Sequence, residues 1–178
     1  MSNIALIIGS LSQNSLNRKI ANHIVNHLPS NLTVEEVVIA DLPLYTQDLD
    51  QDDIASYERV RKQIQSATAV LIVSPEHNRS IPAAMKNVLD IASRPNGQNL
   101  WANKKVAVVT ASPGSYGGIN SGLHLRQSLQ AVGADVFRSP EVYLSQAHTA
   151  LDEQGQVANE RTSQFLIKFA TAFAEWVQ

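Results

Sequence analysis

The chain has 178 residues, of which 44% are hydrophobic, and a formal net charge of -2. This length is typical of one domain with a substantial core, so we expect residues 1–178 to form a single domain. The small net charge, without a block of like charges, argues against a nucleic-acid or membrane-surface partner. There is no cysteine, no apolar run as long as a membrane-spanning helix and no signal-peptide pattern, so we expect a cytoplasmic protein.

Short apolar runs alternate with helical patterns along the whole chain. The apolar runs predict strands over 4–8, 33–39, 68–73 and 105–110, and a fifth strand over 134–144 that is interrupted at Ser139-Pro140. Periodic patterns predict helices over 15–28, 52–66, 83–93, 119–131 and 159–177. This alternation predicts an α/β fold of the flavodoxin-like type. We expect a three-layer sandwich whose five-stranded parallel sheet has the order 2-1-3-4-5, with helices on both faces.

The loop after the first predicted strand reads GSLSQNSLN, residues 9–17, and leads directly into a helix. A helix start at the carboxyl end of a strand presents free amides and a positive dipole end, which together bind an anion. The loop is neither the G-x-G-x-x-G of a dinucleotide site nor a lysine-bearing phosphate loop. Its serines and asparagines are equally consistent with a turn that only caps the helix.

Two further loops follow the third and fourth predicted strands, at the same edge of the sheet. Residues 75–78 (PEHN) combine a proline with polar residues whose amides are able to face a planar ring, although a helix-capping turn with Ser80 as cap fits them too. Residues 112–118 (SPGSYGG) contain three glycines, which allow the backbone to approach a ligand closely. The sequence therefore predicts one ligand site where the three loops meet.

These loops also carry a family resemblance. The segments GSLSQNSLNRKIA, SPEHNRSIPAAMKNVLD and SPGSYGGINSGLHLRQSL together resemble the NADPH-dependent FMN reductase family, which includes quinone and chromate reductases. The resemblance implies noncovalently bound FMN, which takes a hydride from NADPH or NADH. Two electrons then pass to a small-molecule acceptor, namely a flavin, a quinone, an azo compound or a metal oxyanion.

The resemblance also implies which residues bind FMN, and it assigns no side chain as a general acid or base. The phosphate would be held by the first loop, the flavin ring lined by the second and its pyrimidine edge cradled by the third. The implied residues are Ser10, Ser12, Ser15, Leu16 and Asn17, then Pro75, Glu76, His77 and Asn78, and finally Ser112, Gly114, Tyr116, Gly117 and Gly118. Three of this chain's residues depart from the family pattern: Ser12 replaces an arginine, His77 a tyrosine and Ala83 a glycine.

Other function classes fit the sequence less well. A flavodoxin-type electron carrier without its own NAD(P)H oxidation is the main alternative, but such carriers are strongly acidic and this chain is not. A receiver domain needs acidic residues where Gly9-Ser10 stand, and a serine hydrolase needs a G-x-S-x-G turn, which is absent. His23 and His27 are spaced like a metal pair, but no third ligand accompanies them.

The helix predicted over 83–93 is apolar around much of its circumference. An ordinary surface helix has a single apolar stripe. We therefore expect the outer face of this helix to meet a second subunit, giving a homodimer or a homotetramer. The residues concerned are Ile81, Ala83, Ala84, Met85, Val88, Leu89, Ile91 and Ala92.

Overall fold

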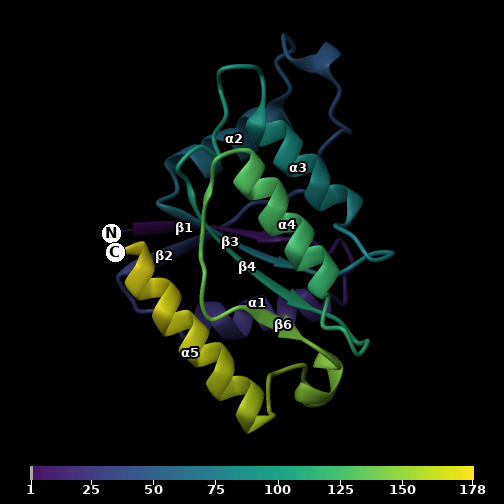
Figure 1. Ribbon diagram of the computed structural model, residues 1–178, viewed down its shortest axis with the longest axis vertical. Coiled ribbons are helices and arrows are strands. Elements are labelled where there is room, and N and C mark those ends of the chain that lie inside the picture. Colours follow the sequence, from purple (N-terminus) through teal and green to yellow (C-terminus); the bar gives the residue numbers. More distant parts are fainter. Residues whose placement is uncertain (1) are drawn as a thin grey trace.

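A parallel sheet runs through the middle of the computed structural model, which describes residues 2–178 (Figure 1). Its strand order is β2-β1-β3-β4-β5, with β6 also paired to β4, and every pairing is parallel. The predicted order and fold class are therefore confirmed. The strands are β1 (Ser2–Ile8), β2 (Leu32–Glu36), β3 (Ala69–Ser74), β4 (Lys105–Ala111), β5 (Asp135–Val136) and β6 (Val142–Leu144).

The fifth predicted strand is indeed broken, and its two halves are β5 and β6. Asp135 and Val136 pair with the beginning of β4, and residues 142–144 pair with its end. The segment between them contains Ser139-Pro140, and proline cannot donate an amide hydrogen to a ladder. The chain thus leaves the edge of β4 and returns to it, which gives the sheet a sixth, very short strand.

Helices cover both faces of the sheet, as Figure 1 shows. One face carries α1 (Leu16–Asn26) and α5 (Glu160–Val177), and the other carries α2 (Ala55–Ser66), α3 (Ala83–Ser93) and α4 (Ile119–Ala131). Short 3-10 turns lie at Gln47–Leu49 (η1) and Ala147–Ala150 (η2). The second helix begins at Ala55 rather than at 52, because the residues before it form η1 and an irregular excursion. None of these helices combines the length and apolarity needed to cross a bilayer.

Alternate residues of the central strands supply the two cores. In β1, Ile4, Leu6 and Ile8 pack toward α1 and α5, whereas Ala5 and Ile7 pack toward the opposite helices. This is the pattern of a parallel strand that is buried on both faces. The aromatic residues of α5 also pack into this core: Phe169 and Phe173 are fully buried, while Phe165 and Trp176 are only partly buried.

The apolar residues of α3 are mostly buried within the same chain, so most of the apolar surface that was predicted to meet a second subunit is covered by the chain itself. Met85, Val88, Leu89, Ile91 and Ala92 are all at most 5% exposed. Part of the cover comes from Trp101, whose indole N–H donates to the Leu89 carbonyl at 3.0 Å. Another part comes from the excursion after β2, which is fixed to α3 through Asn87.

Asn87 makes that attachment with both ends of its amide. Its Oδ1 accepts from the Tyr45 amide at 2.8 Å, and its Nδ2 donates to the Pro43 carbonyl at 2.8 Å. The exposed face of α3 instead carries a charged pair, in which Lys86 contacts Asp90 at 2.6 Å. The helix is apolar on several sides because several parts of its own chain pack on it.

Candidate functional site

The carboxyl ends of β1, β3 and β4 meet at one edge of the sheet, and glycine makes the closest approach possible. The Gly9 amide donates to the Val73 carbonyl at 2.9 Å. A Cβ on Gly9 would lie 2.4 Å from the Ser74 Oγ and 2.9 Å from its Cβ, so a larger residue cannot occupy this position without displacing the end of β3. The first two predicted loops therefore begin side by side.

The first loop, residues 10–17, presents a run of unused backbone donors. Among the hydrogen bonds of residues 2–178, none is donated by an amide of this loop; the next amide, that of Arg18, donates to the Ser15 Oγ at 3.2 Å. Ser15 is therefore the N-cap of α1. The loop therefore caps the helix and also leaves amides free at the positive end of the helix dipole.

Asn17 connects the first loop to the end of β4. The side chain is buried, and its Nδ2 donates to the Ala111 carbonyl at 3.2 Å. Its Oδ1 is also buried, yet it accepts no hydrogen bond from any described residue. A buried amide oxygen without a donor is costly in a finished core, so its position is suited to a ligand that brings a hydroxyl or N–H group.

The second loop is a tight two-residue turn. The His77 amide donates to the Ser80 carbonyl at 3.0 Å, and the reverse bond is 2.9 Å. Asn78 and Arg79, between them, have φ angles of +48° and +65°, which is the left-handed region. The His77 amide is consequently engaged within the loop, whereas the amides of Glu76 and Asn78 donate to no described residue.

Glu76 has a side-chain role that the sequence did not reveal. Its carboxylate accepts from the amides of Asn120 at 2.9 Å and Ser121 at 3.3 Å, in the first turn of α4. The side chain is only 11% exposed, and Arg79 lies 3.8 Å from it. A negative charge at a helix N-terminus is stabilising. Glu76 therefore fixes the second loop to α4, the helix that follows the third loop. Its carboxylate thus occupies the positive dipole end of α4.

The third loop depends on two glycines in left-handed conformations, Gly117 at φ +63° and Gly118 at φ +76°. A Cβ on Gly117 would lie 2.7 Å from the backbone of Tyr143, and one on Gly118 would lie 3.0 Å from the Cβ of Thr110. Neither amide donates to a described residue. These two donors therefore remain available even though Glu76 covers the first turn of α4.

The side chain of Arg79, in the second loop, contacts Tyr116 of the third loop. The Arg79 guanidinium carbon is 4.2 Å from the centre of the Tyr116 ring, which is the geometry of a cation–π contact. Tyr116 is 63% exposed, and within its loop the Ser112 Oγ accepts from the Gly114 amide at 3.1 Å. The structure thus brings all three predicted loops to one edge of the sheet and connects them through side chains.

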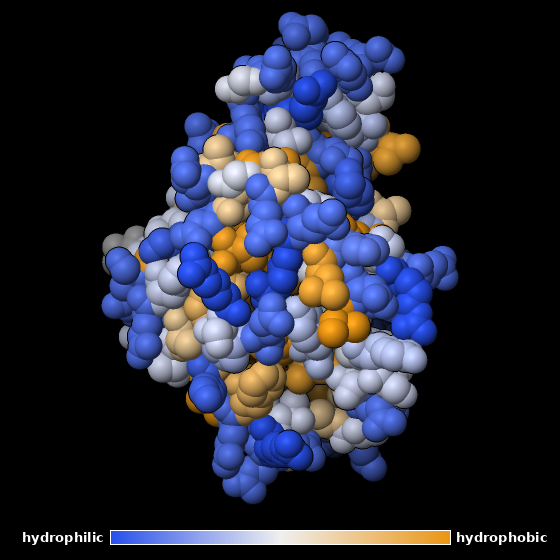
Figure 2. Space-filling model, in the orientation of Figure 1, coloured by the Kyte–Doolittle hydropathy of each residue, from blue (hydrophilic) through white to orange (hydrophobic). Residues whose placement is uncertain are grey.

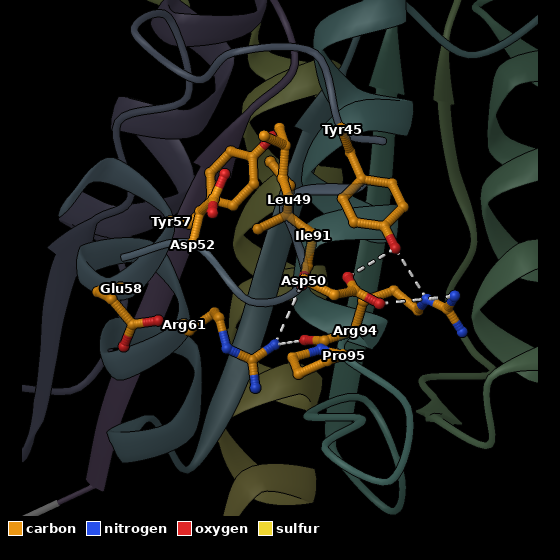
Figure 3. Close-up of a pocket in the computed structure, with 10 residues that line it drawn as sticks. All are labelled: Tyr45, Leu49, Asp50, Asp52, Tyr57, Glu58, Arg61, Ile91, Arg94 and Pro95. Atoms are coloured by element: carbon orange, nitrogen blue, oxygen red, sulfur yellow. Dashed lines mark hydrogen bonds and ion pairs between the residues drawn. The ribbon is translucent and has the colours of Figure 1, made fainter. Parts of the chain in front are cut away.

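A different cavity, drawn in Figure 3, lies beside the excursion after β2. There the Tyr45 hydroxyl donates to Asp50 at 2.8 Å and accepts from the Arg94 Nε at 2.9 Å. Arg61 donates to carbonyls at the end of α3, including those of Ile91 and Arg94. These polar groups already satisfy one another, so we interpret the cluster as the structural attachment of the excursion.

His23 and His27 stack on α1 with their ring centres 4.4 Å apart. The His23 Nε2 lies 3.1 Å from the Ser163 hydroxyl of α5, and burial together with the neighbouring His27 lowers the pKa of His23. Within residues 2–178 no group of three potential metal ligands comes together, around these histidines or elsewhere.

Comparison with known proteins identifies the family. The sequence profile described as "NADPH-dependent FMN reductase" matches residues 2–149. The chain belongs to the NADPH-dependent FMN reductase family. A quinone reductase from Pseudomonas putida is 40% identical over 176 residues, which cover 98% of this chain and 94% of that protein. A 2-hydroxy-1,4-benzoquinone reductase from a Burkholderia species is 36% identical over 98% of this chain and 96% of its own length.

Solved structures agree with this assignment. The flavoenzyme NAD(P)H:(acceptor) oxidoreductase FerB from Paracoccus denitrificans superposes with a TM-score of 0.92 at 36% identity, covering 99% of this chain and 97% of that one. An FMN-dependent NADH-azoreductase from Bacillus anthracis, solved in complex with FMN, superposes with a TM-score of 0.68 at 16% identity. The match covers 98% of this chain and 100% of that one, and at this identity it supports only the fold. The predicted function, that of an FMN-dependent NAD(P)H oxidoreductase, is thereby confirmed.

Proposed function

We propose that this FMN-dependent NAD(P)H oxidoreductase reduces a quinone, and that it binds FMN at the edge formed by the three loops. The observation that carries the binding site is the set of unengaged amides there, in residues 10–17 and at Gly117 and Gly118. The proposal of a quinone as acceptor is supported by the two quinone-reducing relatives, which this chain matches over nearly their whole length.

The residues present fit a flavin mononucleotide. A phosphate needs several donors at a helix start, and the first loop supplies amides together with the hydroxyls of Ser10 and Ser12. The buried Oδ1 of Asn17 provides an acceptor for a hydroxyl of the sugar-alcohol chain. No cationic side chain stands at position 12, so the amides have to carry more of the phosphate charge than in relatives with an arginine there.

Further residues would hold the flavin ring. Pro75 and the amides of Glu76 and Asn78 line one part of the edge, with the side chain of His77 exposed beside them. Gly117 and Gly118 supply two unengaged amides, which would stabilise negative charge on the pyrimidine edge. The other residues that we propose to bind FMN are Ser15, Leu16, Ser112, Gly114 and Tyr116.

When bound, FMN supplies the hydride and electron chemistry that no amino-acid side chain here is able to supply. The protein would fix the position of the cofactor. The nicotinamide nucleotide and the quinone would take turns at the same edge. We therefore expect ping-pong kinetics, with parallel double-reciprocal plots for the nicotinamide nucleotide and the quinone.

The binding site is tested by Asn17→Ala with Asn14→Ala as the matched control. Asn14 belongs to the same loop but is exposed and makes no side-chain hydrogen bond among residues 2–178. We expect the dissociation constant of FMN, measured by fluorescence quenching, to rise about tenfold for Asn17→Ala, equivalent to one lost hydrogen bond of about 1.4 kcal/mol. Equal FMN affinity in the two variants would contradict this site.

The acceptor is tested by steady-state turnover of the FMN-loaded protein with NADH or NADPH and a benzoquinone. Rapid oxidation of the nucleotide only when a quinone is present supports the proposed function. If the nucleotide is oxidised with free flavin, an azo dye or a metal oxyanion but not with any quinone, the proposed acceptor is wrong. If no acceptor supports oxidation, the electron-carrier alternative replaces it.

We also propose self-association and a cytoplasmic location. Two small residues at the start of α3, Ala83 and Ala84, lie partly exposed, and Leu123 of the adjacent α4 is 49% exposed. Small residues allow a second subunit to approach closely, although apolar side chains on the face in Figure 2 are scattered among hydrophilic ones. A dimer or tetramer mass by light scattering, reduced to the monomer mass in Ala83→Arg, is the expected result. The cytoplasm is where reduced nicotinamide nucleotides are supplied.

A further inference from the structure

A hollow lies beside the first loop, between that loop and the end of β2. Ser10 and Ser12 of the proposed phosphate site line its near wall, and nothing in the proposed FMN site uses its far wall. That wall is formed by Glu36, the last residue of β2, and by residues 37–40 immediately after it. The strand β2 is the edge strand of the sheet, next to β1.

Two exposed apolar side chains line the hollow from different segments of the chain. Leu11, in the first loop, is 54% exposed, and Val38, beyond β2, is 47% exposed. Only five large apolar side chains among residues 2–178 are as exposed as these, and two of them line this one hollow. Exposed apolar groups on both walls of a hollow provide a place for a flat apolar ring.

Between these walls lies an ion pair, formed by Arg18 and Glu36. The two guanidinium nitrogens contact the two carboxylate oxygens at 2.7 Å each, so the pair is bidentate. Both side chains remain partly exposed, at 42% and 37%. Arg18 lowers the pKa of Glu36, so the carboxylate is ionised at neutral pH. Each oxygen still has a lone pair with which to accept from a ligand.

The position of Glu36 has a chemical meaning in doubly wound folds. In dinucleotide-binding domains, a carboxylate at the end of the second strand accepts hydrogen bonds from the hydroxyls of the adenosine ribose, and a nearby arginine accommodates a 2′-phosphate instead. Here the carboxylate is present and the arginine is already engaged by it. The pair as a whole is neutral, so it suits an uncharged diol better than a phosphate.

We propose that this hollow binds the adenosine half of the nicotinamide dinucleotide, with Glu36 accepting from the ribose hydroxyls and Leu11 and Val38 enclosing the adenine. The proposal rests on the oxidoreductase function described above and adds a co-substrate preference to it. Three strand spacings of about 4.8 Å separate β2 from β4, so an extended dinucleotide is long enough to reach from the hollow to the flavin edge. A 2′-phosphate would meet the Glu36 carboxylate, and the chain should therefore prefer NADH to NADPH.

The test uses fragments that lack the nicotinamide ring, so that binding is separated from turnover. Calorimetric titration of the FMN-loaded protein with ADP-ribose and with 2′-phospho-ADP-ribose measures the two affinities directly. We expect ADP-ribose to bind the unmodified protein about tenfold more tightly than its 2′-phosphorylated form. Glu36→Gln should weaken ADP-ribose about tenfold and strengthen the 2′-phosphorylated form, because Arg18 is then free to contact the phosphate.

Glu35→Gln is the matched control, since Glu35 is the neighbouring residue of β2 but contacts Gln63 at 2.6 Å and does not line the hollow. Its two fragment affinities should equal those of the unmodified protein. The proposal is overturned if ADP-ribose does not bind, or if Glu36→Gln changes neither affinity more than Glu35→Gln does. Continued nucleotide oxidation by the FMN-loaded protein in that case would show that the oxidoreductase function stands without this hollow.

Discussion

Replacing Glu76 with glutamine tests how the second loop is fixed to α4. The carboxylate accepts two amide hydrogen bonds from the first turn of that helix, at 2.9 and 3.3 Å, and it is only 11% exposed. Glutamine keeps an acceptor oxygen but removes the negative charge. The loss is therefore the charge-dependent part of these bonds together with the interaction with the helix dipole.

The expected cost is about 1–2 kcal/mol, because hydrogen bonds to charged groups contribute about 1.5–3 kcal/mol, neutral ones about 1 kcal/mol, and a charge near a helix terminus about 0.3–1 kcal/mol. At about 2–4 °C per kcal/mol for a protein of this size, the melting temperature of Glu76→Gln should fall by roughly 2–8 °C. Urea unfolding measures the same difference as a free energy, with the slope of the transition unchanged.

Glu153→Gln is the control for this change, because Glu153 lies exposed in a turn and forms no ion pair or side-chain hydrogen bond within residues 2–178. Its unfolding free energy should remain within about 0.5 kcal/mol of the unmodified protein. FMN affinity should fall several-fold only in the Glu76 variant, since the loops then lose the contact that holds them together. A stability loss in Glu76→Gln no larger than in the control would refute the capping role.

Three further changes test other parts of the site and of the fold. Ser12→Arg should tighten FMN about tenfold in equilibrium titration by adding a charged phosphate contact, and an unchanged affinity would show that position 12 does not face the phosphate. Gly9→Ala should lower the unfolding free energy by about 1–3 kcal/mol through its clash with Ser74, and Ser74→Gly in the same chain should restore most of it; no recovery would mean that the clash lies elsewhere. Because burial and His27 lower the pKa of His23, the unfolded chain binds a proton more readily, and unfolding free energy should fall as the pH drops through about 6.5. His27→Gln should make that fall shallower, and an equal slope in both proteins would count against the coupling of the two rings.

The strand order and the meeting of the three loops at one edge of the sheet could be predicted from the sequence for a simple physical reason. Strands that are buried on both faces appear as uninterrupted apolar runs, and the loops after their carboxyl ends are rich in glycine, serine and asparagine. The break at Ser139-Pro140 was also visible, because proline cannot take part in a ladder. The path of the chain between β2 and α2 could not be predicted, since residues 37–54 are mostly irregular and show no period.

The apolar surface of α3 shows why the group that buries a helix cannot be assigned from that helix alone. A helix that is apolar on several sides has to be covered, but its own sequence does not say by what. Here Trp101 and the segment around Pro43 provide the cover, the first through a bond to the Leu89 carbonyl and the second through Asn87. Neither contact follows from local spacing, because the partners lie 12 and 44 residues apart in the chain.

The site loops share a feature that explains how free amides persist without collapsing onto one another. Each is held by a side chain whose partner belongs to a different loop or strand: Asn17 contacts the end of β4, Glu76 contacts the start of α4, and Arg79 contacts Tyr116. The amides that remain free are therefore not needed to fix the loops. A phosphate or flavin edge consequently meets donors that are already oriented, and little of its binding free energy is spent on ordering the chain. That division of roles, with side chains building the edge and amides facing the ligand, is why substitutions at Asn17 and Glu76 should affect FMN affinity although neither residue supplies a charge to its phosphate.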